Sequence, residues 1–380
     1  KVRDVSFISV PNSIVALGDI AHFHRSRFDI PLIGITGSNG KTTTKEMIAA
    51  ILSKKFSVLK NFGTENNHIG VPLTLMRLNS KHKVAVLEMG TNRLGEIRRL
   101  SEIAAPTRAL ITNVGPSHLQ YLKDTDTVMK AKCEILERLD KDAKVVVNGD
   151  DDALKNLKTD FKLVRFGLSR EADFYADKVN IEPGGINFKL NGKWDICLNL
   201  VGRHNVYNAL GAIAAAWDLG VSIDEIKEAL KEFRVPNMRM EVKSLGSIKI
   251  INDSYNSNPL SMKQAIEALS DMTTNGRKIL VAGDMLELGN FAGRFHHLLG
   301  KQAAQSGIDL IVAVGRLAEY IAKGAQEGGM SQKKITLCNL TKEACGAVVN
   351  LIKKGDTILV KGSRAMKMEQ IVEELETQFK

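Results

Sequence analysis

The chain has 380 residues, a length that predicts two or three domains at roughly 100–200 residues per domain. Its hydrophobic content of 44% and charged content of 25% are those of a soluble globular protein, and no apolar stretch reaches the ~20 residues of a membrane span. The net charge of +10 would suit a nucleic-acid protein, but basic and acidic residues are interspersed and aromatic residues make up only 5%. We therefore expect no nucleic-acid partner and no membrane insertion. A positive field that attracts small polyanions fits the charge equally well.

The cysteines and the start of the chain indicate a cytoplasmic protein. Cys133, Cys197, Cys338 and Cys345 have no CxxC spacing and are expected to be reduced thiols. The chain starts at Lys1, and no basic segment followed by an apolar one marks a secretory signal. We expect a cytoplasmic protein that acts as a monomer.

The first 29 residues predict a helix and a connector. Ile14, Leu17, Ile20 and Ala21 have helical spacing, and a polar run follows at residues 22–27. A segment this short cannot hold a core of its own. We therefore interpret residues 1–29 as the last element of a preceding domain together with its linker.

Residues 30–235 predict a central α/β domain. Continuous apolar runs indicate strands buried on both faces of a mostly parallel sheet, and they occur at residues 30–35, 84–88, 109–113 and 144–148. Residues 173–200 instead alternate apolar and polar side chains, and Asn191-Gly192 is a strong hairpin signal, so a small antiparallel sheet is expected there. Helices are expected at residues 205–219 and 222–233, the second capped by Ser222.

Pro236-Asn237 interrupts this pattern and marks the expected start of a C-terminal domain, residues 236–380. Strands and helices alternate again beyond it, which is typical of a Rossmann-like doubly wound fold. Strands are expected at residues 248–252, 278–282, 310–314 and 357–361, and helices near residues 261–270, 292–306, 316–326, 342–353 and 365–378. The predicted fold class is therefore α/β in both domains.

A glycine-rich turn connects the first strand of the central domain to a helix. It reads Gly37-Ser38-Asn39-Gly40-Lys41-Thr42, and apolar residues with helical spacing follow over residues 45–53. Backbone N–H groups at a helix N-terminus form an anion site, a lysine supplies a positive charge, and a hydroxyl can reach Mg²⁺. The loop is shorter than the full nucleotide-binding pattern, so the alternative is a tight turn with a solvated Lys41. The phosphate-loop interpretation predicts a P-loop-type ATPase domain.

Polar side chains also follow other predicted strands, at the carboxyl ends where ligands of open α/β sheets gather. Glu88 is a candidate second anchor for Mg²⁺, and the alternative is a solvated rim carboxylate or a helix cap. His118 follows the strand that ends at Asn113, and a lone histidine is more often a hydrogen-bonded structural residue than a ligand. The cluster Asp253–Pro259 would either face a ligand across a cleft or form a turn that caps the next helix.

Taken together, these motifs resemble the Mur ligase family over residues 12 to 375. The matching segments are Thr36–Glu46, Asn66–Pro72, Glu88–Gly90, Asn113–His118, Ala131–Ile135, Gly202–Asn205, Asn208–Leu210, Asp253–Pro259, Gly283–Gly289 and Lys361–Arg364. The first five imply ATP-dependent formation of an amide bond. Asp253–Pro259 and Gly283–Gly289 resemble the members that add D-alanyl-D-alanine to UDP-N-acetylmuramoyl-tripeptide. That resemblance implies these two substrates and a role in peptidoglycan synthesis, and hence in cell-wall growth, cell shape and cell division.

The resemblance also implies roles for individual residues. ATP would be bound by Gly37, Ser38, Asn39, Gly40, Lys41, Thr42, Thr43, His204, Asn205, Arg239 and Asp253. One Mg²⁺ would be held by Thr42 and Glu88, and a second by His118 and by Lys132 carbamylated with CO₂. The implied catalytic residues are Lys41, His118, Lys132 and Arg239, and the implied substrate-cleft residues are Asn67, Tyr255, Asn256 and Asn258.

The resemblance also bears on the domain content of the chain and on its alternative functions. The family has an N-terminal domain that holds the UDP-sugar end of the substrate, and residues 1–29 are the expected remnant of that domain. The nearest alternative function is another ligase of the family, of the amino-acid-adding or folylpolyglutamate type. A further alternative, suggested by the phosphate loop and the net charge, is a P-loop nucleic-acid ATPase.

Overall fold

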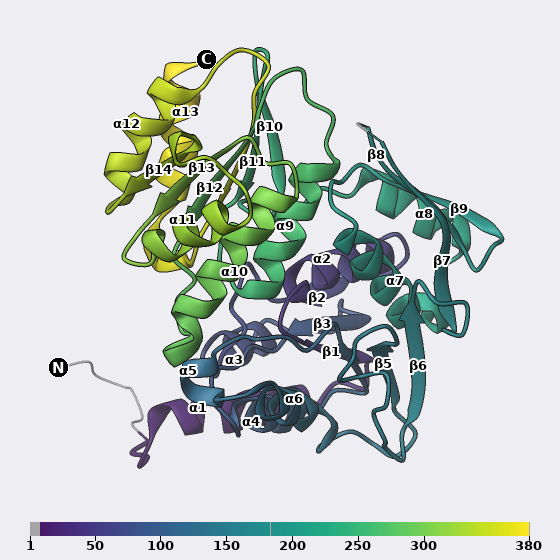
Figure 1. Cartoon of the computed structure of the whole chain (residues 1–380). Helices are drawn as coiled ribbons and strands as arrows, with labels where there is room; N and C mark the ends of the chain where they lie inside the picture. The colour runs from purple at the N-terminus through teal and green to yellow at the C-terminus, as the bar shows by residue number, and fades with distance from the viewer. Residues whose placement is uncertain (1–7, 183, 380) are drawn as a thin grey trace.

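Two β-sheets organise the chain, one in the lower and right-hand part of Figure 1 and one in its upper part. The computed structural model describes residues 8–182 and 184–379. Residues 1–7 of the expected N-terminal segment, Pro183 of the expected antiparallel region, and Lys380 lie outside the described residues.

The larger sheet has nine strands in the described part of the chain, in the order β2-β3-β1-β4-β5-β6-β7-β8-β9. Pairs from β2 through β7 are parallel, whereas β8 is antiparallel to both β7 and β9. Ile35 lies opposite Glu88 and Thr36 opposite Ile111, so β1, β3 and β4 end at one edge. The strands are β1 (Leu32–Thr36), β2 (Val58–Lys60), β3 (Val84–Glu88), β4 (Arg108–Ile111), β5 (Lys144–Asn148), β6 (Lys162–Gly167), β7 (Phe174–Glu182), β8 (Gly185–Leu190) and β9 (Trp194–Leu198).

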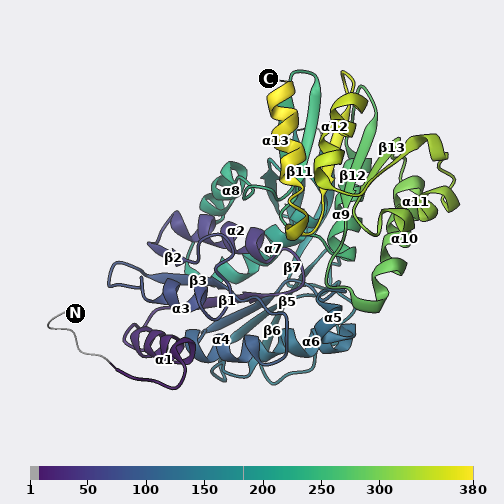
Figure 2. The same cartoon turned by 90° about the vertical axis from the view of Figure 1, so that its left-hand side faces the viewer.

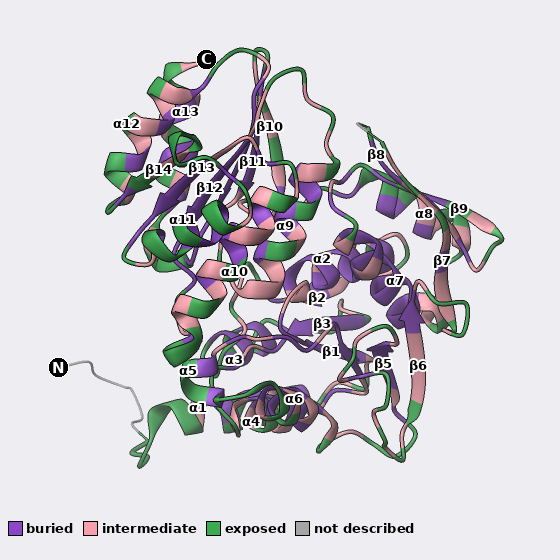
Figure 3. Cartoon of the chain, in the orientation of Figure 1, coloured by how far each residue is buried: buried purple, intermediate pink, exposed green. Residues whose placement is uncertain are grey.

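Helices cover both faces of the larger sheet around β1, β3, β4 and β5, and these strands are almost entirely buried (Figure 3). Successive side chains of a strand point to opposite faces, so Ile33 and Ile35 pack against α2, α7 and α8, while Leu32 belongs to the core beneath α1, α3, α4 and α6. This two-sided burial explains the continuous apolar runs. The helices are α1 (Ser13–Arg25), α2 (Lys41–Ser53), α3 (Gly70–Leu75), α4 (Glu96–Ala104), α5 (Leu119–Leu122), α6 (Thr125–Cys133), α7 (His204–Ala216) and α8 (Ile223–Glu232).

The smaller sheet has six strands among the described residues, in the order β10-β11-β15-β12-β13-β14, and only the β10–β11 pair is antiparallel. Figure 2 shows α10 and α11 on one side of this sheet and α13 on the other. Its elements are β10 (Glu241–Leu245), β11 (Ile248–Asp253), α9 (Pro259–Asp271), β12 (Lys278–Gly283), α10 (Ala292–Gln305), β13 (Leu310–Val314), α11 (Ala318–Glu327), β14 (Ile335–Cys338), α12 (Thr341–Leu351), β15 (Thr357–Lys361) and α13 (Glu369–Gln378).

The predicted α/β class is confirmed, with a mostly parallel larger sheet that ends in an antiparallel part and a second, mostly parallel sheet. Strands β3 and β5 occupy the predicted residues, Asn191-Gly192 connects β8 to β9, and Ser222 caps α8. Helix α2 begins at Lys41, directly after the glycine-rich turn. Strands β2, β6, β10 and β14 were not predicted, because they are short or half-exposed and lack a continuous apolar run.

The predicted N-terminal helix is present as α1, but two of the four residues in its apolar stripe are exposed. Ile14 and Ile20 are exposed, and the buried residues of α1 are Gly18, Ala21 and Arg25. A Cβ atom on Gly18 would lie 2.7 Å from a side-chain carbon of Ile103, so α1 packs closely on α4 through its small residues. Within the described residues, every helix is too short or too polar to cross a bilayer.

Candidate active site

The loop between β1 and α2 has the backbone shape of a phosphate cradle. Gly40 has φ +78° and directly precedes the first residue of α2. A Cβ atom there would lie 2.3 Å from the side-chain oxygen of Asn208, so a larger residue does not fit. The N–H groups in the first turn of α2 have no partner within the helix, and they border this loop. Such an arrangement is typical of an anion-binding site. Lys41 folds back over this loop, and its Nζ donates to the carbonyl oxygens of Gly37 at 2.8 Å and Ser38 at 3.3 Å.

The loop is held in place from the end of β4. The Asn113 side-chain oxygen accepts a hydrogen bond from the Asn39 N–H at 2.9 Å, and its backbone oxygen accepts one from the Ser38 N–H at 2.9 Å. The hydroxyl of Thr112 donates to the Asn39 carbonyl oxygen at 2.6 Å. Asn113 is thus a support of the loop.

Glu88, the last residue of β3, lies beside the first turn of α2. It is 1% exposed, and its two carboxylate oxygens accept hydrogen bonds from the Thr42 hydroxyl and the Asn66 amide, each at 2.7 Å. Oxygen donors of this kind are those that Mg²⁺ prefers. No group of three or more His, Cys, Asp or Glu side chains that could hold a metal ion occurs among the described residues. Any ion here would therefore depend on hydroxyl, water, phosphate or modified-lysine oxygens as well.

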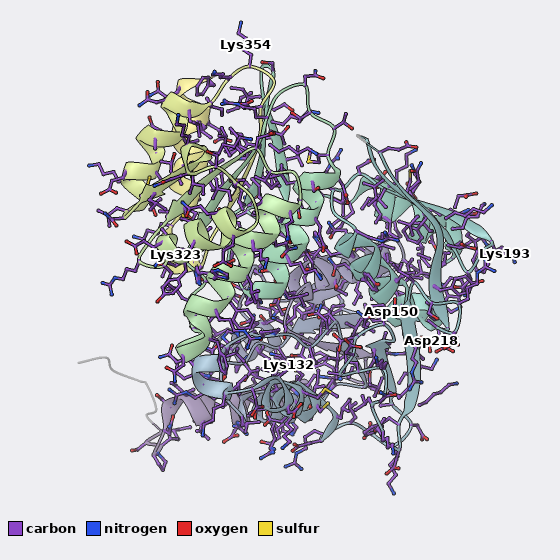
Figure 4. The ribbon with its side chains drawn as sticks, viewed as in Figure 1. Lys132, Asp150, Lys193, Asp218, Lys323 and Lys354 are labelled. Atoms are coloured by element: carbon purple, nitrogen blue, oxygen red, sulfur yellow. The ribbon has the colours of Figure 1, made fainter. Side chains whose placement is uncertain are left out.

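Lys132 lies on α6 and is labelled in Figure 4. It belongs to the first unit, which is the larger sheet with its helices and loops. The second unit is the smaller sheet with its helices and loops. Its side chain is 1% exposed. Burial lowers the pKa of the Lys132 ammonium well below its usual value, and the charge of Lys41 lowers it further, against the carboxylates of Glu96, Glu134 and Glu88. A larger share of Lys132 is therefore present as the neutral amine, which is the form that reacts with CO₂. Burial likewise lowers the pKa of Lys41, against the charge of Glu88.

His118 lies just before α5, in the first unit, and contacts a residue of the second unit. Its Nδ1 lies 2.6 Å from Oε2 of Glu287, in the loop after β12. Both residues have left-handed backbone conformations, with φ of 54° for His118 and 62° for Glu287. Such strained positions of non-glycine residues cluster at functional sites.

The cluster after β11 faces the phosphate loop from the smaller-sheet unit. The Lys361 ammonium pairs with Asp253 at 2.5 Å and donates to the Asn256 carbonyl oxygen at 2.9 Å. The Arg239 guanidinium lies over the Tyr255 ring, 4.0 Å from its centre. This packing orders the side chains that the second unit brings to the site.

Two hydrogen-bonded contacts join this cluster to the first unit. The amides of Asn39 and Asn258 bond in both directions, at 3.2 and 2.8 Å. The Tyr255 hydroxyl donates to the Thr64 hydroxyl at 2.7 Å. Asn258 also caps α9. One residue therefore links a helix start in the second unit to the phosphate loop in the first.

His204 and Asn205 begin α7. The Asn205 amide donates to the Val201 carbonyl oxygen at 2.8 Å and accepts from the Asn208 amide at 2.9 Å. Burial lowers the pKa of His204 to about 4, against the opposing charge of Asp253. Among the described residues, its buried Nδ1 finds no hydrogen-bond partner. A bound ligand could supply that partner.

These groups surround one cavity of about 620 Å³ between the two units. Fifteen of the predicted site residues line it: Ser38, Asn39, Gly40, Lys41, Thr42, Thr43, Glu88, His118, His204, Asn205, Arg239, Asp253, Tyr255, Asn256 and Asn258. Gly37, Lys132 and Asn67 are not among its lining residues. Asn67 lines an adjoining cavity of about 440 Å³, and its side-chain oxygen accepts from the N–H groups of Ile69 and Gly70 at the start of α3.

The structure adds lining residues that were not selected from the sequence as site residues. They are Thr64, Asn66, Asn208, Glu287 and Lys361 among others. Four of these lie inside motifs that the sequence indicated, but spacing does not show which side chain of a motif faces the cavity. Thr64 had no sequence signal, because it enters the cavity from an irregular loop between β2 and α3.

The fold and the cavity define a two-unit α/β protein with a glycine-rich loop, shaped like a phosphate cradle, where the units meet. The model of the Mur ligase middle domain matches residues 35–216, and the model of the Mur ligase, glutamate ligase domain matches residues 238–364. The chain belongs to the Mur ligase family.

Similar proteins cover nearly the whole chain. The UDP-N-acetylmuramoyl-tripeptide–D-alanyl-D-alanine ligase of Bacillus subtilis is 37% identical over 97% of this chain and 80% of its own length. The Escherichia coli ligase of the same name is 34% identical, over 98% of this chain and 83% of its own length. Among solved structures, MurF from Acinetobacter baumannii has a TM-score of 0.90 at 32% identity and covers 100% of this chain and 84% of that one. MurF from Thermotoga maritima, in complex with ADP, has a TM-score of 0.89 at 28% identity, over 100% and 87%.

Proposed function

We propose that this protein is an ATP-dependent ligase that joins D-alanyl-D-alanine to UDP-N-acetylmuramoyl-tripeptide in peptidoglycan precursor synthesis. One observation carries the proposal: a phosphate loop and a buried Thr42–Glu88 oxygen pair open into a 620 Å³ cavity that a second α/β unit covers. The volume lies in the ~300–1,000 Å³ range of ligand sites. The names of the relatives at 34–37% identity supply the two substrates.

The chemistry requires an activated acyl group, because a carboxylate does not condense with an amine in water. The terminal carboxylate of the tripeptide attacks the γ-phosphorus of ATP, which gives an acyl phosphate and ADP. The amine of D-alanyl-D-alanine then attacks the acyl carbon to form a tetrahedral intermediate. Collapse of that intermediate forms the amide and releases phosphate and the amine proton.

Positive charge and backbone N–H groups do most of the work, because several anionic groups must meet at one place. In this proposal Lys41 leaves its contacts with the Gly37 and Ser38 carbonyl oxygens and binds the β- and γ-phosphates together with the loop amides. Arg239, held against Tyr255, contacts the γ-phosphate from the second unit. The second unit also excludes water that would hydrolyse the acyl phosphate.

In this proposal Thr42 and Glu88 would hold one Mg²⁺ through their oxygen atoms, and His118 with a carbamylated Lys132 would hold a second. Glu88 is buried and both of its oxygens already accept hydrogen bonds, so it is ordered in advance of any ion. When bound, Mg²⁺ neutralises phosphate charge. Carbamylation would join the neutral Lys132 amine to CO₂ with loss of one proton, which would give this side chain an anionic oxygen donor. The lowered pKa of Lys132 favours this reaction.

The start of α7 and the cluster after β11 are proposed to bind the nucleoside part of ATP. His204 and Asn205 would contact adenine, and the unpaired Nδ1 of His204 supports a polar contact at this position. Asp253 would contact the ribose and share its carboxylate with Lys361. Asn256 and Asn258 would lie beside the acceptor amine, and Asn67 would lie in the adjoining cavity. We further propose two domains, residues 30–235 and 236–380, in a cytoplasmic monomer.

The deciding experiment combines the protein with ATP, UDP-N-acetylmuramoyl-tripeptide and D-alanyl-D-alanine, and measures the product mass. We expect UDP-N-acetylmuramoyl-pentapeptide and one ADP per amide. Other amines, glutamate included, test for another ligase of the family. Hydrolysis stimulated by DNA or RNA without an amide product would favour the nucleic-acid ATPase instead.

Two variants test the residue assignments. Lys41→Ala should abolish ATP consumption, whereas Lys54→Ala, at the exposed end of the same helix, should not; full ligation by Lys41→Ala would refute the phosphate-loop assignment. Lys132→Ala should be inactive and partly rescued by a short carboxylate in solution. Normal activity of Lys132→Ala without the added carboxylate would rule out the carbamate.

A further inference from the structure

Glu287 belongs to the smaller-sheet unit, yet its carboxylate contacts a side chain of the larger-sheet unit. We propose that Glu287 is a positioning residue that orients the His118 imidazole as a metal ligand, and that it does so only while the two units are docked. This inference rests on the proposed function, in which His118 holds Mg²⁺. It makes assembly of the metal site depend on closure of the second unit.

The contact is specific on both partners. Nδ1 of His118 lies 2.6 Å from Oε2 of Glu287, and the backbone oxygen of Glu287 accepts from the Gln120 N–H at 2.9 Å. A Cβ atom on Gly289 would lie 3.4 Å from the Gln120 Cα, so the two loops approach closely there as well. Side-chain and backbone contacts together dock the Glu287 loop on the segment that starts at His118.

The hydrogen bond decides which ring nitrogen of His118 carries the proton. An ionised carboxylate can only accept hydrogen bonds, so Nδ1 must donate. In the neutral ring Nε2 then carries the lone pair that a metal requires. Metal-binding histidines typically donate their other N–H to a carboxylate in this way.

Glu287 is presented by a loop that is fixed to its own unit. The Asp284 carboxylate accepts from the N–H groups of Arg316 at 2.9 Å and Leu317 at 3.1 Å. The Leu286 N–H donates to the Ser363 hydroxyl at 2.8 Å. Because these bonds lie within the second unit, Glu287 moves with that unit as a whole. Separation of the units would remove the carboxylate from His118.

The contact is too exposed to serve mainly for stability. The Glu287 side chain is 42% exposed, and ion pairs at such positions contribute little. The chain offers a matched control in His297 and Glu327, whose Nε2 and Oε1 atoms lie 3.0 Å apart with Glu327 58% exposed. Both control residues belong to the second unit, so this pair does not cross between units.

The first test compares Glu287→Ala with Glu327→Ala in the whole protein. Ligase kcat is measured against MgCl₂ concentration, and thermal unfolding confirms that each variant is folded. We expect Glu287→Ala to lose about 10- to 100-fold in kcat or in apparent Mg²⁺ affinity, the range for loss of a carboxylate behind a metal-binding histidine. Glu327→Ala should match the wild type. Glu287→Gln, which keeps the shape but not the charge, should fall between them.

The second test needs neither Mg²⁺ nor turnover. In protein labelled with ¹⁵N at histidine, the His118 ring should show the Nδ1–H tautomer, and Glu287→Ala should lose this preference. Wild-type Mg²⁺ dependence together with an unchanged tautomer in Glu287→Ala would overturn the inference while leaving the proposed function intact. Absence of ligation by the wild type would instead refute the proposed function, and the tautomer measurement would still decide whether Glu287 orients His118.

Discussion

The ammonium group of Lys45 donates a hydrogen bond to the carbonyl oxygen of Asn61, 2.7 Å away, at a position where Lys45 is 0% exposed. It also donates to the Gly63 carbonyl oxygen at 3.1 Å. Asn61 in turn bonds the backbone N–H and C=O of Glu88, both at 3.0 Å. The helix that follows the phosphate loop is thereby tied to the strand end that carries Glu88. We infer that Lys45 helps to set the position of the Glu88 carboxylate.

Replacing Lys45 with Met should therefore affect stability and catalysis together. The change leaves the buried Asn61 carbonyl oxygen without its donor, at about 1–3 kcal/mol, and also removes the contacts with the Gly63 carbonyl oxygen and the Glu46 carboxylate. We therefore expect a loss of about 2–4 kcal/mol in the free energy of unfolding. We expect kcat to fall as well, because Glu88 loses its support. Urea denaturation and ligase kinetics measure both effects. Lys54→Met is the matched control, since Lys54 pairs with Glu232 at the surface and should cost at most about 1 kcal/mol. Equal losses in the two variants would contradict the interpretation.

Gly40→Ala should impair ATP binding. The residue has φ +78°, and the new Cβ would meet the Asn208 side-chain oxygen at 2.3 Å. We expect a loss of about 1–3 kcal/mol in stability and a higher KM for ATP, because the loop must shift to accommodate the methyl group. Gly346→Ala, inside α12 with open space around it, should instead raise stability by about 0.5–1 kcal/mol. Thermal unfolding and ATP titration distinguish the two.

Asn258 combines two tasks that different substitutions can separate. Its side chain caps α9 and also bonds the Asn39 amide of the phosphate loop. Asn258→Ser keeps a capping oxygen but is too short to reach Asn39, so it should leave the unfolding temperature nearly unchanged and weaken ATP binding. Asn258→Ala should show the same weaker binding and lose about 1 kcal/mol of stability in addition. If Asn258→Ser bound ATP as the wild type does, the contact with Asn39 would have no part in nucleotide binding.

Titration of His204 should make stability depend on pH. Burial lowers its pKa from 6.5 to about 4 in the folded protein, so the unfolded chain binds more protons at this residue between those values. Its contribution to stability is therefore unchanged above pH 6.5 and declines as the pH falls from 6.5 toward 4. The total change is at most about 3 kcal/mol at ~1.4 kcal/mol per pKa unit. His204→Gln should show a flatter pH profile in denaturant titrations at pH 7, 5.5 and 4.5, and parallel profiles would contradict the assignment.

The sequence located the candidate site well where the site follows strand ends. Carboxyl ends of parallel strands share one sheet edge, so an apolar run followed by a polar residue predicts a position on that edge. Lys41, Glu88 and His118 were predicted in this way, and all three line one cavity. Asn66 and Asn67 have different roles although they are the same residue type. They are neighbours in one motif, but Asn66 bonds Glu88 while the Asn67 side chain accepts from the Gly70 N–H at the start of α3, and residue type alone does not separate them.

Local pattern alone was sufficient for the α/β class, for the glycine-rich turn between β1 and α2, and for the long buried strands, because each depends on residues within a few positions of one another. The residue pairs that join the two units beside the cavity are instead far apart in the sequence. His118 with Glu287, Asn39 with Asn258, and Thr64 with Tyr255 are separated by 169, 219 and 191 positions. Their contact depends on how the two sheets dock. Periodicity carries no information about that docking, and only the tertiary structure decided it.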